Sequence, residues 1–162
     1  MHAQADAAPP VDPSLGEAVR SHYPATARRR TLVLTLRNRM EELTPACRQL
    51  CDFLADRGLS ARTLYAADLV AGEMMSNAIR HAYPKDGTVR MEVELGEECV
   101  MLTFTDRGQP FDPTDPPEAS RPTPLRDTLD GGLGLRMVHH TASALYYRRI
   151  GRENRTLVII QR

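Results

Sequence analysis

The sequence lacks features that would place it in several common classes of protein. Its cysteines, Cys47, Cys51 and Cys99, are odd in number and show no CxxC spacing, which argues against a disulfide framework or a zinc knuckle. No apolar run approaches the ~20 residues needed to cross a bilayer. The first residues show no basic region followed by an apolar core, so no signal peptide is visible. We therefore expect a cytoplasmic protein without a membrane segment, with its cysteines acting as small buried hydrophobes.

The chain also lacks an excess of charge of either sign. Lys and Arg total 21, and Asp and Glu total 21, so the formal net charge is zero. Proteins that bind nucleic acids usually carry a basic excess, because neutralising phosphates supplies much of their affinity. The triplet at 28–30, Arg-Arg-Arg, is a local exception that we interpret as a solvated lead-in to a strand. We expect no direct nucleic-acid binding, and a chain of 162 residues is long enough for one domain with a real core.

What is present is a regular succession of helix and strand patterns after a proline-rich start. Residues 1–29 predict a flexible N-terminal tail, because three prolines interrupt the first thirteen positions. Residues 107–131 have no period and contain six of the twelve prolines, which indicates a long functional loop or lid. Elements are predicted as a strand at 31–36, helices at 40–54 and 60–83, a hairpin at 89–95 and 100–104, a helix from 131, and strands at 144–150 and 156–160.

This order of elements predicts the class of fold. The strands come in hairpins, and all the helices can cover one face of the sheet. We expect residues 30–162 to form an α+β two-layer sandwich with a mixed, mainly antiparallel sheet. An alternation of strand and helix, as in a Rossmann or P-loop domain, is not seen.

The first candidate site lies on the second predicted helix. Glu73, Asn77 and His81 are spaced by four residues, so they lie on one face of the helix, one turn apart. An Asn oxygen is a suitable ligand for Mg²⁺, and a Glu one turn away could deprotonate a hydroxyl near the metal. By itself, this pattern fits a solvated helix face better than it fits a site.

Two further motifs follow in the chain. Asp106-x-Gly108 comes directly after a strand, where a carboxylate could accept a hydrogen bond from an exocyclic amine and glycine would let the backbone approach a flat ligand. The segment Gly131-Gly132-Leu133-Gly134 opens a helix, and its exposed backbone N–H groups would favour phosphate. Each motif alone also fits an ordinary turn or a loop-to-helix hinge.

Together and in this order, the three motifs resemble the N, G1 and G2 boxes of the GHKL (Bergerat-fold) ATPase and kinase superfamily. The amino-acid sequence around these motifs is similar to that of the anti-sigma-factor serine kinases of the RsbW and SpoIIAB type. The segments that carry the resemblance are Glu73-Met74-Met75-Ser76-Asn77-Ala78-Ile79-Arg80-His81-Ala82-Tyr83, Asp106-Arg107-Gly108-Gln109-Pro110-Phe111-Asp112 and Gly131-Gly132-Leu133-Gly134-Leu135. The resemblance covers about residues 30–162.

The resemblance implies a role for each matching residue. Glu73 would be the catalytic base, Asn77 would coordinate Mg²⁺ between the phosphates, and Asp106 would bind the adenine amino group. The remaining ATP-binding residues implied are Gly108 beside the base, Gly132, Leu133 and Gly134 at the phosphates, and Thr156 near adenine. Some members of the family have an Arg just before the second glycine box, whereas this chain has Asp130 there. Arg126, with Arg121 behind it, is then the nearest candidate for the γ-phosphate.

The resemblance also implies a function. We expect an ATP·Mg²⁺-dependent protein serine/threonine kinase that sequesters a sigma factor or another regulatory target and phosphorylates a STAS-domain antagonist, in a partner-switching pathway. Relatives usually form homodimers. Two alternatives stay open: an ATP-binding sequestering module with little or no kinase activity, favoured by Asp130, and a stand-alone ATPase domain like that of histidine kinases.

Overall fold

A computed structural model describes residues 30–81, 87–115 and 132–162 of the chain. The predictions made for the tail at 1–29, for Gly131 and for Arg126 in the lid lie outside the described residues. So does most of the predicted lid itself.

The described strands form one five-stranded sheet in the order β1-β2-β3-β5-β4. Every neighbouring pair in this sheet is antiparallel, whereas the sequence predicted a mixed, mainly antiparallel sheet. β3 and β4 point the same way, but β5 lies between them, so the crossover through the last helix creates no parallel pair. The strands are β1 (Arg30–Arg37), β2 (Thr88–Leu95), β3 (Cys99–Asp106), β4 (Ala144–Ile150) and β5 (Glu153–Gln161).

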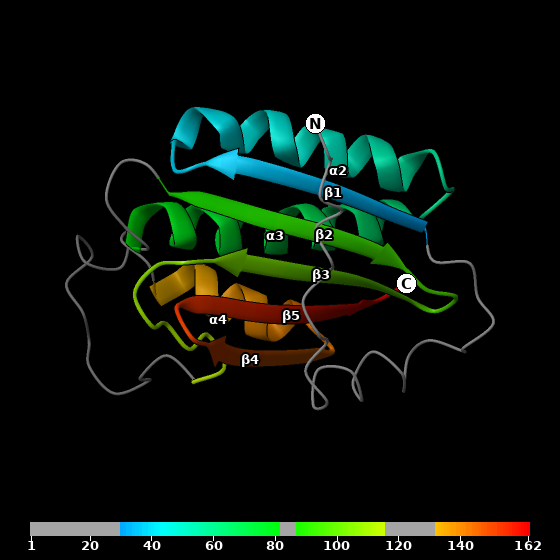
Figure 1. Ribbon diagram of the computed structural model, residues 1–162. Helices are drawn as coiled ribbons and strands as arrows, with labels where there is room; N and C mark the ends of the chain where they lie inside the picture. Colours follow the sequence, from blue (N-terminus) through cyan, green and yellow to red (C-terminus); the bar gives the residue numbers. More distant parts are fainter. Residues whose placement is uncertain (1–29, 82–86, 116–131) are drawn as a thin grey trace, which may run out of the picture.

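The described helices all lie on one face of this sheet, as predicted (Figure 1). Ser60 caps one of them, because its Oγ accepts a hydrogen bond from the Thr63 N–H at 3.2 Å. Gly58, with φ of 71°, ends the helix before it. The helical elements are η1 (Met40–Glu42), α2 (Leu43–Ala55), α3 (Ala61–His81) and α4 (Gly132–Thr141). None of the described helices is long and apolar enough to span a membrane.

One predicted boundary is wrong. The sequence was interpreted as a turn over 151–155, with the last strand starting at Thr156, but β5 begins at Glu153. The turn needs only Gly151 and Arg152, because Ile150 pairs with Glu153 and Gly151 adopts a φ of 59°. The three extra residues, Glu153, Asn154 and Arg155, place Asn154 in the sheet.

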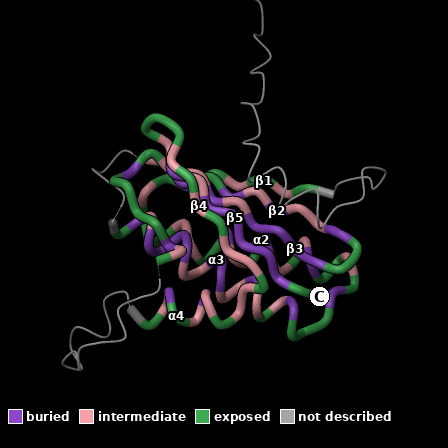
Figure 2. Tube along the Cα trace, turned by 90° about the horizontal axis from the view of Figure 1, so that it is seen from below, coloured by how far each residue is buried: buried purple, intermediate pink, exposed green. Residues whose placement is uncertain are grey.

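The main core lies between the sheet and the helices (Figure 2). Leu50, Leu54, Val70 and Met75 project from α2 and α3 with no exposed surface, and they pack against the alternating inner positions of the strands. Each such side chain contributes about 1.5–3 kcal/mol of burial free energy. A smaller buried cluster, Cys99, Met101, Leu157 and Ile159, lies on the outer positions of β3 and β5. Because α3 packs on both the sheet and α4, the positions of its polar residues are fixed.

The cysteines of the described chain are free, as expected. Cys99 is buried, whereas Cys47 and Cys51 are only half-buried. Both lie on α2, and their thiols are close to the Asp68 carboxylate of α3. The prediction of a buried hydrophobe therefore holds fully only for Cys99.

Candidate functional site

The polar face of α3 carries Glu73 and Asn77 one turn apart, as the spacing predicted. Asn77 is not solvated: it is 5% exposed, and its Nδ2 has no hydrogen-bond partner among the residues that the structure describes. An unpaired buried donor costs about 1–3 kcal/mol, so the helix carries unused hydrogen-bonding capacity at this point. The interpretation of this face as a plain solvated stripe is therefore wrong for Asn77. The backbone of His81 ends α3, and its side chain lies outside the described part of the chain.

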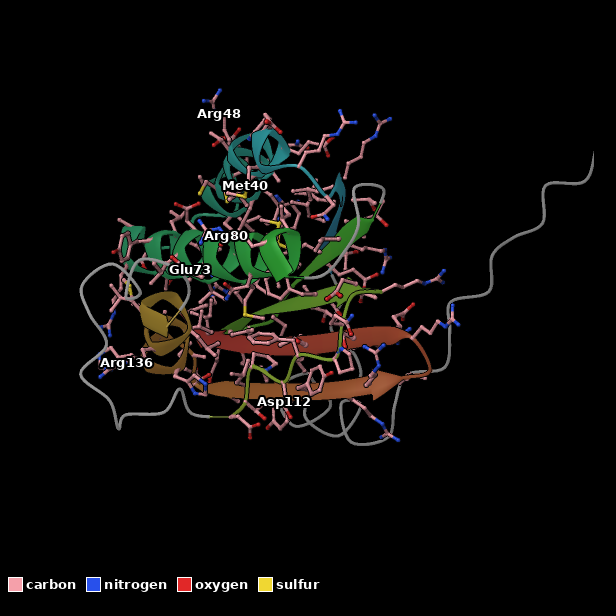
Figure 3. All side chains as sticks on the ribbon, turned by 90° about the vertical axis from the view of Figure 1, so that its left-hand side faces the viewer. Met40, Arg48, Glu73, Arg80, Asp112 and Arg136 are labelled. Carbon is pink, nitrogen blue, oxygen red and sulfur yellow. The ribbon has the colours of Figure 1, made fainter. Side chains whose placement is uncertain are left out.

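The Glu73 side chain lies against the first turn of α4. A Cβ atom added to Gly134 would overlap Glu73 Oε2 and lie 2.6 Å from its Cδ. Figure 3 shows Glu73 on the side of α3 that faces α4. The absence of a side chain at 134 therefore gives the Glu73 carboxylate its place beside a helix N-terminus, where backbone N–H groups favour negative charge.

Asp106 ends β3, and its carboxylate organises the loop that follows. Its Oδ1 accepts a hydrogen bond from the Gly108 N–H at 2.7 Å, which closes a tight turn. The same oxygen accepts a second bond, at 2.9 Å, from the side-chain amide of Asn154. Asn154 is the partner of Asp106 in the β3–β5 register, so the sheet brings the two side chains together.

Asn154 anchors the loop after β3 to the far edge of the sheet. Its Nδ2 also donates to the Gln109 carbonyl at 2.8 Å. Its Oδ1 accepts from the Tyr147 hydroxyl at 2.8 Å and from Arg149 Nη1 at 2.7 Å. Arg149 Nη1 donates in addition to the Gly108 carbonyl at 3.1 Å. The segment 106–109 is thus held by side chains of β4 and β5 that the sequence analysis did not select.

A small hollow joins the two halves of the site. It holds about 30 Å³, roughly the volume of one water in the liquid. Thr156, which pairs with Phe104 in the sheet and is 5% exposed, contributes to its wall. The full lining is Met74, Asn77, Ala78, Phe104, Asp106, Gln109, Phe111, Asn154 and Thr156. The hollow is far smaller than ordinary ligand pockets of about 300–1,000 Å³, so it could admit a small molecule only if side chains such as Phe111, which is 41% exposed, moved.

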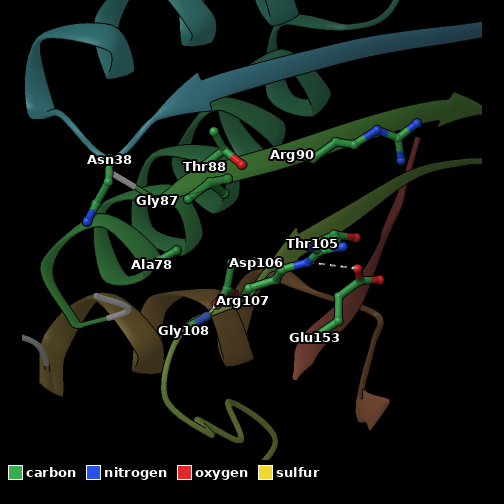
Figure 4. A pocket seen from close by; sticks show the side chains of 11 residues that line it. Asn38, Ala78, Gly87, Thr88, Arg90, Thr105, Asp106, Arg107, Gly108 and Glu153 are labelled. Carbon is green, nitrogen blue, oxygen red and sulfur yellow. Dashed lines mark hydrogen bonds and ion pairs between the residues drawn. The ribbon is translucent and has the colours of Figure 1, made fainter. Parts of the chain in front are cut away.

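A larger cleft of about 580 Å³ opens on the other side of Asp106, around the ends of β2 and β3 (Figure 4). Arg107 spans it towards Glu153 on β5, at an N–O distance of 3.8 Å. Neither Glu73, Asn77, Gly134 nor Thr156 lines this cleft. We therefore place the candidate site at the small hollow, where the residues with suitable chemistry converge, and not at the larger opening.

Comparison with known proteins identifies the fold of this site. The model of the histidine kinase-like ATPase domain matches residues 36–162. The chain belongs to this family. The GHKL resemblance inferred from the three motifs is confirmed, and an ATPase domain of this family implies that ATP is the ligand.

Within this family, the chain is similar to two curated protein kinases. A 92-residue stretch is 33% identical to the serine/threonine-protein kinase BtrW of Bordetella bronchiseptica and covers 56% of this chain and 65% of that protein. The chain is also 30% identical over 92 residues to the serine-protein kinase RsbW of Halalkalibacterium halodurans. This second match covers 51% of this chain and 57% of that protein. The match thus spans less than two thirds of either relative. The predicted resemblance to serine kinases of the RsbW type is therefore confirmed as a resemblance.

A solved structure supports the fold independently. The chain superposes on the structure of the RsbU and RsbW domains of Rv1364c from Mycobacterium tuberculosis with a TM-score of 0.60 and 19% identity. The superposition covers 82% of this chain and 33% of the other. At this identity the likeness establishes the fold, and the predicted α+β sandwich is confirmed.

The ATPase-domain fold brings together most of the predicted site residues. Glu73 meets Gly134, and Asn77, Asp106 and Thr156 line one hollow. Gly108 is held in the turn after β3, and Gly132 is the first residue of α4. Leu133 is 54% exposed, so its side chain is not enclosed by the described site.

Sequence reasoning missed Asn154, Tyr147 and Arg149. Asn154 stands two positions before Thr156, so the alternation of a longer strand would have placed both on the same face. That signal was lost because Glu153 and Asn154 were assigned to the preceding turn. Tyr147 and Arg149 alternate in β4 in the same way, but only the pairing of β4 with β5 directs them at Asn154.

Proposed function

We propose that this ATPase domain is a protein serine kinase that uses ATP with Mg²⁺ and regulates a partner-switching pathway. The observation that carries the proposal is the pairing on α3 of Glu73, which lies against the first turn of α4, with Asn77 one helical turn further along. Asp106, which we propose contacts adenine, lines the same hollow as Asn77. The names of the two relatives, a serine/threonine-protein kinase and a serine-protein kinase, support the same activity.

The residues of the site suggest how transfer proceeds. Glu73 takes the proton of a serine hydroxyl while the serine oxygen bonds to the γ-phosphorus. The bond between that phosphorus and the β–γ bridging oxygen breaks, and ADP leaves with the electron pair. The backbone at Gly132–Gly134 would receive the phosphates at the start of α4. Asp106 would accept a hydrogen bond from the adenine amine.

The chain suits a magnesium ion held mainly by ATP. Asn77 would offer its amide oxygen to the metal at a position that is only 5% exposed. Its amide nitrogen, which has no partner among the described residues, would be left to donate to a phosphate oxygen. The described residues contain no group of three or more His, Cys, Asp or Glu that could hold a metal by themselves. Mg²⁺ usually keeps several waters and takes few protein ligands besides substrate phosphates. In that arrangement Mg²⁺ would neutralise phosphate charge during transfer.

The substrate and partners follow from the same proposal. A STAS-domain antagonist carrying the acceptor serine would be phosphorylated, and a sigma factor or another regulator would be sequestered when the antagonist is absent. We further propose a cytoplasmic homodimer, by resemblance to the RsbW type. Sedimentation of the purified chain with and without ATP tests the dimer directly.

The kinase is tested by transfer of the γ-phosphoryl group from radiolabelled ATP to a cognate STAS protein. The wild-type chain should label serine, and Glu73→Gln should lower the rate by about 10²–10⁴, the usual contribution of a general base. Glu97→Gln, which changes an exposed carboxylate on the β2–β3 turn, is the matched control and should leave the rate unchanged. ATP binding without any labelled serine would refute the kinase.

One specific observation favours a second candidate, an ATP-dependent sequestering module with little transfer. Asp130 precedes the glycine segment, where some relatives have an Arg to stabilise the charge of the γ-phosphate. Under this alternative Glu73→Ala leaves partner control intact, whereas under the kinase proposal partner control collapses. Label that appears on an acid-labile histidine would favour the histidine-kinase alternative.

A further inference from the structure

The side-chain amide of Asn154 is fully used within the protein. It is 4% exposed. Its Nδ2 donates to Asp106 Oδ1 and to the Gln109 carbonyl, and its Oδ1 accepts from Tyr147 and Arg149. An amide offers two N–H donors and two oxygen lone pairs, so these four bonds satisfy it completely.

The two sides of the amide have opposite chemistry, which determines its orientation. Arg149 can only donate, so it must face the oxygen of Asn154. The Gln109 carbonyl can only accept, so it must face the nitrogen. A flipped amide would lose both bonds. The group that Asn154 presents to Asp106 is therefore always an N–H donor.

This donor leaves Asp106 with a defined free acceptor. Asn154 Nδ2 and the Gly108 N–H both bond to Oδ1. Within the described part of the chain, no hydrogen bond reaches Oδ2. A ligand that contacts Asp106 in the hollow therefore meets a carboxylate oxygen, which accepts a hydrogen bond from an N–H group and repels a carbonyl oxygen.

We propose that Asn154 is a positioning residue that sets the base specificity of the site. It holds Asp106 so that the carboxylate accepts from a purine with an exocyclic 6-amino group and rejects a purine with a 6-carbonyl group. The inference rests on the proposed contact between Asp106 and adenine. It adds that the selectivity depends on a β5 side chain whose own amide is already fully hydrogen-bonded within the protein.

The chemistry at position 154 makes the proposal sensitive to an isosteric change. In Asn154→Asp a carboxylate replaces the amide, and one of its oxygens faces Asp106 Oδ1 and the Gln109 carbonyl. The new oxygen at position 154 is repelled by Asp106 Oδ1 and by the Gln109 carbonyl oxygen, because all three atoms are acceptors. Tyr147 and Arg149 keep their bonds to the other oxygen. Asp106 should turn away from the hollow, while the phosphate end of the site is left as it is.

The test compares ATP with inosine triphosphate, which carries a carbonyl in place of the 6-amino group. Calorimetric titration should show that the wild-type chain binds ATP about 10–100-fold more tightly, the range of one hydrogen bond to a charged group. In Asn154→Asp the affinity for ATP should fall by about that factor, and the affinity for inosine triphosphate should change less than about threefold. Tyr147→Phe, which removes one bond to the far side of the amide, should lower the ratio of the two affinities by about threefold.

The ratio separates positioning from general damage. A purely structural role for Asn154 would lower both affinities together and leave their ratio unchanged, and that result would overturn the inference. If Asn154→Asp does not fold, an unchanged ratio in Tyr147→Phe overturns it equally. A wild-type chain that binds both nucleotides with equal affinity would instead refute the proposed contact between Asp106 and adenine. A wild-type preference that survives in both variants would refute only the role of Asn154.

Discussion

The two ends of the site are built on opposite principles. At the proposed base end, Asp106 and Asn154 are bound to each other, to the loop after β3 and, through Asn154, to β4. All four hydrogen bonds of the Asn154 amide are made within the protein. At the proposed phosphate end, Asn77 keeps a buried nitrogen without a partner in the described part of the chain, and Glu73 occupies the space that a side chain at Gly134 would fill. A preorganised end gives specificity at little cost in ordering, whereas an unsatisfied end gains most when its ligand arrives.

The largest expected effect concerns the stability of these two ends. Asn154→Ala would remove all four hydrogen bonds of an amide that is 4% exposed, so we expect a loss of about 3 kcal/mol in the free energy of unfolding. Asn77→Ala removes a buried donor that has no partner among the described residues, so its unfolding free energy should not fall and should rise by about 1 kcal/mol. Urea denaturation of both variants measures the contrast. Equal losses would mean that the two ends are equally preorganised.

The next effect concerns ligand binding at the phosphate end. Asn77→Ala should weaken ATP binding in magnesium by about 30-fold, because the proposed metal ligand is removed. In EDTA, the wild-type chain and the variant should bind ATP within about threefold of each other. Ser76→Ala is the matched control: its buried hydroxyl bonds to the Glu73 carbonyl, and it should not alter the magnesium dependence. A magnesium effect of equal size in Asn77→Ala would show that the metal is held elsewhere.

A smaller effect is expected where Glu73 meets α4. A methyl group in Gly134→Ala would push the flexible carboxylate aside without disturbing the backbone, so kcat should fall about tenfold while stability is unchanged or slightly raised. The effect should vanish in a Glu73→Ala background, as a double-mutant cycle would reveal. If the methyl group lowers kcat equally with or without the Glu73 carboxylate, the two residues act independently.

The smallest expected effect concerns Cys47 on α2, which belongs to neither end of the site. Burial, followed by the charge of the Asp68 carboxylate and a hydrogen bond to it, raises the pKa of Cys47 from 9.0 to about 12. The unfolded thiol ionises first, so its contribution to stability is complete below pH 9 and is lost as the pH rises towards 12. Thermal melts should show a shallower decline over this range in Cys47→Ala than in the wild-type chain. Identical declines would show that ionisation of Cys47 is not linked to unfolding.

The comparison of the two ends also explains which residues could be predicted. Glu73 and Asn77 were found because four-residue spacing on a helix is a local property, and Asp106 was found because it closes an alternating strand. Asn77 was nevertheless open to interpretation as a solvated residue, since spacing shows which residues share a face but not what covers that face. The predicted roles of these residues stay predictions until the variants above are measured.

The sequence by itself determined the order of the elements, the helices on one face of the sheet and the family to which the chain belongs. These depend on hydrophobic periods and on motifs a few residues long. Only the tertiary structure decided that Asn154, 48 positions after Asp106, would hold that carboxylate, and that Gly134 would accommodate Glu73. The physical reason is the register of β3 with β5 and the packing of α3 on α4, both of which depend on the whole core and are not encoded in any short segment.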